Sequence, residues 1–388
     1  MSTKSSGSSL GGIKVLVVTN DFPPRRGGIE SFLLSLCRSL PSGSVVVYTA
    51  RMRGSGAFDA ELDVEVVRDR RATLLPTRRV RRRACELVRH HRCQQVVFGA
   101  AAPLALMADD LRGAGATRIV AITHGHETWW ARLPVTQSLL RRIGNSVDVL
   151  TYVSEHCRQA VAAALSARGA ARLTRMPPGV DLERFSPAVD GRPFRDGLGI
   201  APGRPVVLAA ARLVARKGHD QLIAAWPRVL RAHPAAILLV VGDGPARAGL
   251  ARRVMLEGLR ESVRLVPGVE WVTMPSVYAA ADVFALPCRT RRFGLEPEAL
   301  GLVFLEAAAS GLPLVVGRSG GAPETVQDGE TGHLVDPGNL GEIAGAVVAL
   351  LDDPEAARAM GRRGRSWVAH RFSEQASART FTRLLQDG

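Results

Sequence analysis

The chain has 388 residues, of which 46% are hydrophobic and 22% charged, and this composition excludes a largely disordered protein. Its length exceeds that of an average domain, so we expect two domains. The formal net charge of +15 is concentrated in residues 1–185, which hold 27 Lys and Arg against 15 Asp and Glu, a net of +12. A surface of this kind attracts phosphates or anionic lipid headgroups.

Membrane spans, leader peptides and cysteine-based sites find no support in the sequence. The longest apolar run, 96–108, contains Gly99 and Pro103 and is too short to cross a bilayer. The polar, Ser/Gly-rich start lacks a signal-peptide pattern, so we expect a cytoplasmic protein. The five cysteines include no C-x-x-C pair, so neither a disulfide framework nor a structural zinc site is indicated.

Residues 13–176 alternate between strand and helix patterns. The apolar run 13–19 predicts a buried parallel strand, and the helical spacing of apolar residues in 29–40 predicts the helix that follows. Further strands are expected at 45–49, 64–67, 95–98, 119–123 and 149–153, and helices at 77–90, 104–111, 135–143 and 155–167. This order is typical of a doubly wound α/β domain.

The sequence Pro177-Pro178-Gly179 marks a boundary, after which the alternation restarts. Strands are expected at 206–210, 237–241, 263–266, 283–286 and 314–316, and helices at sites that include 220–231 and 301–310. We therefore predict two Rossmann-like domains, 1–185 and 186–372, facing each other across a cleft. A final amphipathic helix, within 373–388, is able to cross back to the first domain. Open α/β sheets bind ligands at the carboxyl ends of their strands, so functional residues are expected in strand-end loops.

Two strand-end loops of the first half carry candidate site residues. Gly27 and Gly28 precede the first helix, where exposed backbone and the helix N-terminus favour an anion, although a simple tight turn has the same pattern. The loop lacks both the G-x-G-x-x-G and the Walker spacing, which argues against nicotinamide enzymes and P-loop ATPases. His124 and His126 follow the strand 119–123, where a histidine is able to hydrogen-bond a substrate hydroxyl. The competing interpretation is a metal site, but no third ligand with recognisable spacing follows.

The second half supplies two cations and two carboxylates. Arg212 and Lys217 share one strand-to-helix loop, where fixed positive charge neutralises a diphosphate without a metal, and the sequence has no D-x-D pair for Mg²⁺ or Mn²⁺. A solvated basic loop is the alternative interpretation. Glu298 and Glu306 bracket an apolar segment at the start of a helix that reads as buried. A buried carboxylate needs hydrogen-bond donors, and sugar or ribose hydroxyls are suitable ones.

As an ensemble these motifs resemble the retaining glycosyltransferases of family 4, which have the GT-B fold. The resemblance covers nearly the whole chain, and its motifs are GGIE, PGVD with Phe185, Arg212 with Lys217, GDGP, the E-x₇-E pair and GGxPE. One branch of the family comprises actinobacterial mannosyltransferases that move mannose from GDP-mannose to phosphatidylinositol mannosides. The stretches similar to that branch are NDFPPRRGGIESF, THGHE, ARLVARKGHDQLI, LPCRTRR, EALGLVFLEAAASG and SGGAPETV.

The resemblance implies that the second domain binds a nucleotide sugar and the first faces the acceptor. Arg212 and Lys217 are expected to bind the donor diphosphate, assisted by Gly27 and Gly28. Glu306 is expected to hold the nucleotide ribose.

The same resemblance places the transferred hexose against Glu298 and the backbone at Leu302 and Val303. Val269, which Glu270 follows, falls where the family's base-binding loop lies. The segment 289–297 departs from the family's more glycine-rich form, which weakens the transfer of contacts there.

The expected chemistry needs no metal, cofactor or enzyme nucleophile. His124 would lie beside the reacting sugar, with His126 as the alternative. In the mechanism usually proposed for this family, the departing diphosphate helps to deprotonate the attacking hydroxyl, so the protein mainly stabilises charge and orients both partners. The residues expected to carry catalysis are His124, Arg212, Lys217 and Glu298.

The basic first half also contains a run of arginines, namely Arg78, Arg79, Arg81, Arg82 and Arg83. We interpret it as a surface that docks on anionic headgroups at the inner face of the plasma membrane and presents the glycolipid acceptor. The chain has only three lysines, so general arginine usage is the competing interpretation.

Two other functions fit parts of the sequence. The first is a UDP-sugar-dependent transferase with a soluble acceptor. The second is a non-enzymatic, basic nucleic-acid-binding protein, against which stand the aromatic content of 5% and the absence of a known nucleic-acid motif. The sequence leaves the oligomeric state open.

Overall fold

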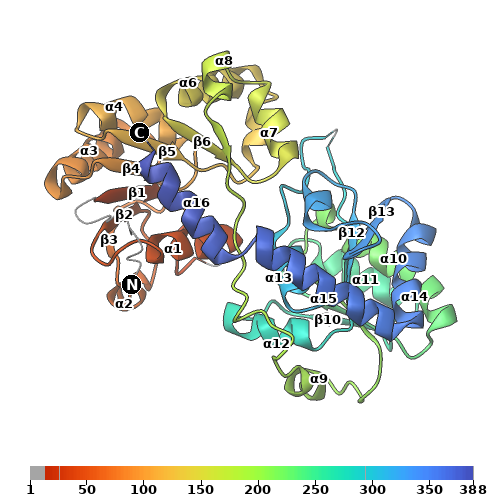
Figure 1. The fold of residues 1–388 in the computed structure, drawn as a ribbon. Helices are drawn as coiled ribbons and strands as arrows, with labels where there is room; N and C mark the ends of the chain where they lie inside the picture. The colour runs from red at the N-terminus through yellow and green to blue at the C-terminus, as the bar shows by residue number, and fades with distance from the viewer. Residues whose placement is uncertain (1–13, 26, 293, 388) are drawn as a thin grey trace, which may run out of the picture. The chain divides into compact units, whose positions relative to one another are not determined.

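The computed structural model describes residues 14–25, 27–292 and 294–387, which form two α/β units (Figure 1). The first unit contains the chain up to Val153, then Arg158–Met176, and finally the residues from Ser377 onward. The second contains Ser154–Cys157 and Pro177–Ala376.

The first unit is built on a seven-stranded parallel sheet in the order β3-β2-β1-β4-β5-β6-β7. The strands are β1 (Val15–Thr19), β2 (Val45–Thr49), β3 (Glu65–Arg68), β4 (Gln95–Phe98), β5 (Arg118–Ala121), β6 (Val149–Tyr152) and β7 (Leu173–Arg175). The helices are α1 (Gly28–Arg38), α2 (Ser55–Ala60), α3 (Arg78–His91), α4 (Ala108–Gly113), α5 (Glu127–Trp130), α6 (Pro134–Ser146), α7 (Glu155–Ala162), α8 (Ala167–Ala170) and α16 (Glu374–Gln386), with a 3₁₀ turn, η1 (Leu104–Met107).

Successive side chains of the central strand β1 point to opposite faces of the sheet, and the core of the first unit therefore has two layers. Leu16 and Val18 belong to one cluster, which also contains the apolar residues of α3, α4 and α6. Val15 and Val17 point to the other cluster, which contains those of α1 and α16. Because helices cover both faces of the sheet, its central strands are buried along their whole length and mostly apolar.

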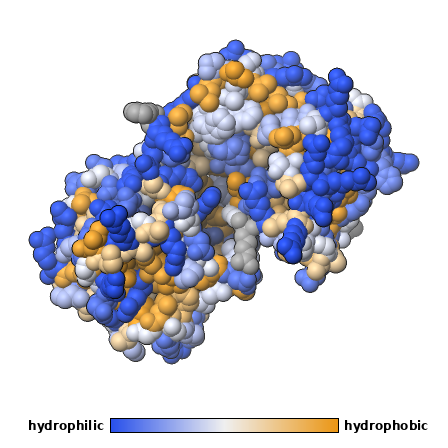
Figure 2. Space-filling view, turned by 180° about the vertical axis from the view of Figure 1, so that it is seen from behind, coloured by the Kyte–Doolittle hydropathy of each residue, from blue (hydrophilic) through white to orange (hydrophobic). Residues whose placement is uncertain are grey.

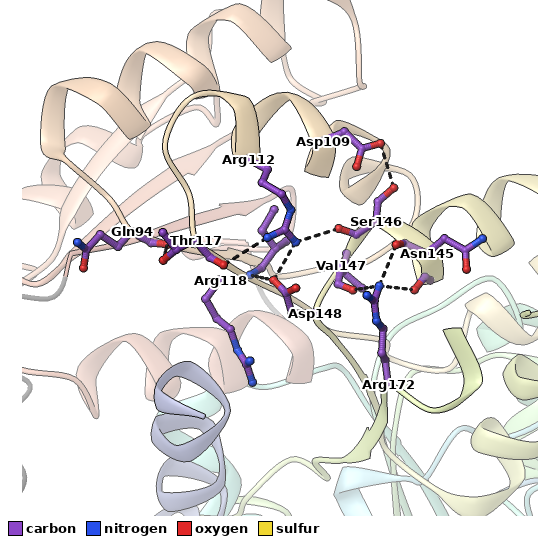
Figure 3. Close-up of polar contacts among 12 residues, drawn as sticks. Gln94, Asp109, Arg112, Thr117, Arg118, Asn145, Ser146, Val147, Asp148 and Arg172 are labelled. Atoms are coloured by element: carbon purple, nitrogen blue, oxygen red, sulfur yellow. Dashed lines mark hydrogen bonds and ion pairs between the residues drawn. The ribbon is translucent and has the colours of Figure 1, made fainter. Parts of the chain in front are cut away.

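Arginines tie down the loops at the amino ends of β5 and β6 (Figure 3). Arg172 Nη1 donates to the carbonyls of Gly144, Asn145 and Val147 at 3.3, 2.8 and 2.5 Å, and so caps the carbonyl end of α6. Asp148 accepts from Arg112 Nη2 at 2.9 Å and from the Ile119 amide at 2.8 Å.

The second unit has a six-stranded parallel sheet in the order β10-β9-β8-β11-β12-β13. The strands are β8 (Val206–Ala210), β9 (Ile237–Val241), β10 (Val263–Val266), β11 (Val283–Leu286), β12 (Leu314–Gly317) and β13 (Gly332–Val335). The helices are α9 (Arg192–Gly197), α10 (His219–Ala232), α11 (Arg247–Leu256), α12 (Met274–Ala279), α13 (Leu302–Ala309), α14 (Leu340–Asp352) and α15 (Pro354–Arg371), with 3₁₀ turns η2 (Ala215–Lys217), η3 (Trp271–Thr273) and η4 (Ala322–Thr325).

The prediction of two Rossmann-like domains is confirmed, and the strands expected at 45–49, 95–98, 206–210, 237–241, 263–266 and 283–286 have those bounds. Two helices expected to be continuous are broken. The pattern 104–111 forms η1 and then α4, and the pattern 155–167 ends at Ala162. The sequence reading missed the edge strands β7 and β13, which are only partly buried and therefore lack a continuous apolar run.

The boundary predicted after residue 185 lies later than the one in the structure, where the second unit begins again at Pro177. Hydrogen bonds explain the difference. The Val180 amide donates to the Phe372 carbonyl at 2.7 Å, and Arg365 Nη1 donates to the Phe185 carbonyl at 2.8 Å. Segment 177–185 therefore packs as part of the second unit.

Helix α16 begins in the second unit and ends in the first. Phe381, Leu384 and Leu385 lie in the core cluster that also holds Val15 and Val17. Among the described residues, no helix combines the length and the apolar character that a membrane crossing requires.

Candidate active site

The centre of the site in the second unit is a buried ion pair. Lys217 Nζ lies 2.8 Å from Glu298 Oε2, and the two side chains are 9% and 8% exposed. Lys217 ends the 3₁₀ turn η2, and Gly218 follows it with a φ of +78°. A Cβ at Gly218 would lie 2.0 Å from the Pro287 carbonyl oxygen, so only glycine allows this loop to pack against the end of β11.

Each charge of this pair holds the other in its ionised form. Burial is the largest single effect on the pKa of Lys217 and lowers it, but Glu298 and Cys288 together outweigh burial and the net shift is upward. Burial raises the pKa of Glu298, but Lys217 and then Arg216 outweigh it and the net shift is downward. Cys288 adds a weak contact, its Sγ lying 3.8 Å from Glu298 Oε2. The pair is therefore charged at neutral pH, as expected for an opposite charge at contact distance.

The backbone of Glu298 is fixed by the loop after β12. Its amide donates to Ser319 Oγ at 3.3 Å, and its carbonyl accepts from the Gly321 amide at 2.8 Å. Gly320 has a φ of +54°, and a Cβ there would lie 2.1 Å from the Glu298 carbonyl oxygen. The SGG segment of the SGGAPETV motif thus fixes the backbone of Glu298, the first carboxylate of the E-x₇-E pair.

The second carboxylate, Glu306, lies on α13 with the side chain almost fully buried. Tyr278 Oη donates to Glu306 Oε2 at 2.7 Å. Burial raises the pKa of Glu306 to about 7, against the lowering effects of the Tyr278 hydrogen bond and the Lys217 charge. The sequence reading missed Tyr278, because a tyrosine in a short apolar helix carries no motif.

Helix α13 begins directly after a glycine. Gly301, at the N-cap, has a φ of +95°, and no side chain caps the helix. Leu302 and Val303 are partly buried and begin the first turn, so their amides are among the groups that an α-helix leaves without internal partners. This geometry is compatible with the backbone contacts to a sugar that the resemblance implies.

Two further cations lie in the loop that holds Lys217. Arg212 is exposed, and within the described parts of the chain its guanidinium has no ion pair or hydrogen bond. Arg216 lies closer to the pair, since its charge contributes to lowering the Glu298 pKa. Its buried Nε finds no hydrogen-bond partner among the residues described. The sequence reading missed Arg216, because nothing in the pattern RKG distinguishes it from a solvated neighbour of Lys217.

Val269 and Glu270 lie between β10 and η3, partly exposed and exposed respectively. The adjacent Trp271 ring carries the Arg184 guanidinium at 3.6 Å from its centroid. This cation–π contact gives the loop one aromatic wall that the sequence reading had not identified.

In the first unit, the loop after β5 is organised by Glu127, whose side chain is fully buried. Its Oε2 accepts from the amides of His124 and Gly125, both at 3.1 Å. His126 is exposed, with Nε2 lying 3.3 Å from Glu127 Oε1. The sequence reading took Glu127 only as a motif letter, and the structure makes it the anchor of the loop.

The histidine favoured by the resemblance has a defined tautomer. His124 Nε2 lies 2.5 Å from the Gly99 carbonyl oxygen, which only accepts, so Nε2 carries the proton. Burial lowers the pKa of His124, against the raising effect of Glu127. A neutral ring with protonated Nε2 leaves Nδ1 as a hydrogen-bond acceptor.

Gly27 and Gly28 are exposed at the start of α1. The Glu30 carboxylate folds back over this turn, where a Cβ on Gly27 would lie 2.2 Å from Oε2, and Arg25 Nε lies 3.0 Å from Glu30 Oε1. An anion at these glycines would therefore meet a carboxylate as well as the helix N-terminus, which the sequence pattern did not indicate.

The arginine run lies on α3, and carboxylates compensate most of its charge. Arg81 pairs with Asp110 at 3.1 Å, and Arg79 pairs with Asp69. Arg82 and Arg83 both pair with Glu86, at 3.6 and 3.3 Å, and Arg78 is exposed. Figure 2 shows mainly hydrophilic side chains over the edge of the first unit where α3 lies, at the right of that view.

No group of three or more His, Cys, Asp or Glu side chains placed to hold a metal ion is found in residues 14–25, 27–292 and 294–387. In the second unit, Arg216, Lys217, Glu298 and Glu306 influence one another's charge, and Arg212 lies in the same loop as Lys217. Their arrangement suits a ligand that combines a diphosphate with hydroxyl groups, because the cations and the carboxylates recognise these two parts respectively.

The chain is similar to known glycosyltransferases in sequence and in fold. Residues 26–184 match the sequence model for "Glycosyltransferase Family 4", and residues 191–367 match that for "Glycosyl transferases group 1". A GDP-mannose-dependent alpha-(1-6)-phosphatidylinositol monomannoside mannosyltransferase of Mycolicibacterium smegmatis is 45% identical over 96% of this chain and 98% of its own length. The enzyme of Corynebacterium glutamicum for the monoacylated lipid is 42% identical with the same coverage. The crystal structure of Anabaena HepE with UDP has the same fold, with a TM-score of 0.80 at 21% identity over 97% of this chain and 100% of that one.

Proposed function

The chain belongs to the family 4 glycosyltransferases, and on that premise we propose that it transfers mannose from GDP-mannose to a phosphatidylinositol mannoside. The full-length likeness to mannosyltransferases with these substrates supports the proposal. The observation that carries it is the buried Lys217–Glu298 pair with Arg212 and Arg216 in the same loop.

Each part of the donor meets a group of suitable chemistry in this proposal. Arg212, Arg216 and Lys217 offer positive charge to the diphosphate. Glu298, held ionised by Lys217, accepts hydrogen bonds from the hexose hydroxyls, and Glu306 accepts them from the ribose. Because three cations are present, we expect turnover to persist in EDTA.

Transfer then proceeds with retention of configuration. The bond between the anomeric carbon and the diphosphate oxygen breaks as the acceptor hydroxyl attacks from the same face, and its proton passes to the departing diphosphate. Negative charge builds up on the diphosphate, so the fixed cations lower the barrier. His124, in the first unit, offers Nδ1 as a hydrogen-bond acceptor for a sugar hydroxyl.

A donor screen tests this function. Thermal shift and donor hydrolysis are measured with GDP-mannose, UDP-glucose, UDP-N-acetylglucosamine and ADP-glucose, each with and without EDTA. Selective stabilisation by GDP-mannose that survives EDTA is expected. A preference for a UDP-sugar would contradict the proposed donor, and loss of turnover in EDTA would contradict the metal-independent mechanism.

We propose further that the protein works at the inner face of the plasma membrane and docks through its first unit. The cations of α3 supply long-range attraction, and the exposed apolar residues Leu133 and Val135, 46% and 76% exposed, supply a segment able to enter the headgroup region. Replacing Arg78 and Arg82 by glutamine should weaken binding to anionic vesicles more than transfer to a short-chain soluble acceptor. Equal loss in both assays would contradict docking.

A further inference from the structure

Tyr278 makes the one hydrogen bond to the Glu306 carboxylate that the described residues provide, at 2.7 Å. The tyrosine is fully buried on α12, while Glu306 retains 8% exposure. The Tyr278 hydroxyl occupies Oε2, and Oε1 is left to accept from a ligand.

The surroundings of Tyr278 fix where its hydroxyl lies. The Phe185 ring packs edge-on against it, with centroids 5.7 Å apart and planes at 79°. The Phe284 ring also packs against it, with centroids 5.8 Å apart. A fully buried ring that packs against two aromatic side chains has little rotational freedom, so its hydroxyl is a preorganised donor.

Near neutral pH, the Tyr278 hydrogen bond affects whether Glu306 is protonated. Burial raises the pKa of Tyr278 well above its ordinary value, and Glu306 raises it further, so the phenol stays protonated. For Glu306, burial favours the neutral carboxyl, while the Tyr278 hydrogen bond and the Lys217 charge favour the carboxylate. Without the phenol, Lys217 alone would oppose protonation.

We propose that Tyr278 is a positioning residue for donor binding, whose hydroxyl holds one oxygen of Glu306 and leaves the other to accept a hydrogen bond from the donor ribose. This inference rests on the proposed function, which assigns the ribose to Glu306. Tyr278 does not itself touch the donor in this arrangement.

The test is the pH dependence of GDP-mannose binding by the full chain carrying Tyr278→Phe, measured by calorimetry between pH 6 and 8.5. We expect affinity to fall about 10-fold near pH 6.5, the scale of a lost hydrogen bond to a charged group, and to approach the wild-type value at pH 8.5. The midpoint of the profile should move upward by about one pH unit, because more alkali is needed to ionise Glu306. A wild-type midpoint in the variant would overturn the proposal.

A matched control exists in the first unit, where Tyr48 Oη donates to Asp69 Oδ2 at 2.6 Å and is also fully buried. Tyr48→Phe removes the same kind of bond and should leave the donor pH profile unchanged. Glu306→Gln tests the proposed ribose contact separately from the proposed role of Tyr278. If this variant binds GDP-mannose like wild type, the proposed ribose contact fails. If it binds weakly while Tyr278→Phe keeps the wild-type midpoint, only the role of Tyr278 fails.

Should Tyr278→Phe not fold, 3,5-difluorotyrosine incorporated throughout the chain tests the same point, because the sequence holds only three tyrosines. A fluorinated phenol is a stronger hydrogen-bond donor, so the midpoint should move to lower pH, in a Tyr48→Phe background as well. An unmoved midpoint would overturn the proposal.

Discussion

Replacing Lys217 by alanine tests the central ion pair. The change removes the cation 2.8 Å from Glu298 and leaves a carboxylate with 8% exposure and no counter-ion in contact. Breaking a buried pair in this way costs about 3 to 5 kcal/mol, since the remaining charge stays desolvated. For a unit of this size that corresponds to a fall in melting temperature of roughly 10 °C. Turnover should fall at least ~100-fold, the scale of losing one charge-stabilising group.

Thermal denaturation and GDP-mannose turnover, the latter well below the melting temperature, separate the two effects. The matched variant is the double change Lys217→Ala with Glu298→Gln, in which no charge is left unpaired. It should recover much of the lost stability but none of the turnover. A single variant within about 0.5 kcal/mol of wild type would refute the pairing argument. Near-normal turnover would remove Lys217 from the mechanism.

Further predictions concern the pH response, the first unit and the glycine loop after β12. Wild-type affinity for GDP-mannose should rise as the pH increases through about 7, where Glu306 ionises, and calorimetry on Glu306→Gln should give a flat profile. The pKa of Glu306 in the folded protein lies above the ordinary value of 4.5. Glu306 therefore contributes roughly 3 kcal/mol to the free energy of unfolding below pH 4.5, and this contribution is lost as the pH rises through 7. Denaturant titrations at several pH values would detect the change. Arg172→Ala should lower the free energy of unfolding by about 1 kcal/mol through the uncapped end of α6, and no change in urea denaturation would mean that water replaces the guanidinium. Gly320→Ala should abolish turnover, because the new Cβ would displace the Glu298 backbone. Gly329→Ala is the control: Gly329 has a φ of +76° and no atom lies within 4 Å of the added Cβ, so this variant should lose only stability. Equal activity of the two variants in the transfer assay would contradict the predicted steric clash at residue 320.

The sequence predicted the inner strands of both sheets, because buried parallel strands are mostly apolar, and it missed the partly buried edge strands β7 and β13. It thereby placed Lys217 and Glu298 in loops that follow strands of the second sheet. It did not predict that the two would pair, since contacts between loops 81 residues apart depend on how β8 and β11 lie side by side. The same limit hid Tyr278, whose role arises only from the packing of α12 near α13.

Local motifs predicted the position of His124 but not its chemistry. Its tautomer is set by the Gly99 carbonyl, which follows a different strand, and by a loop that the buried Glu127 anchors. The Gly27-Gly28 turn shows the opposite case. Its pattern indicated an anion site, while the fold brings the Glu30 carboxylate over it. The sequence shows that Glu30 lies three residues after Gly27, but it does not show that the Glu30 side chain points back over the glycine turn.

Because α16 ends in the first unit, the first unit can complete its fold only after the second unit has been synthesised. Gln95 Nε2 donates to the Leu385 carbonyl across 290 residues of sequence, and Phe381 fills part of the same core layer. A ribosome therefore releases the whole second unit before the first can close that layer. Until then, the apolar face of the first sheet that α16 covers is exposed to other nascent chains. Contacts this distant in sequence form slowly, so we expect completion of the first unit to be the late step of folding and the stage at which chaperones are needed.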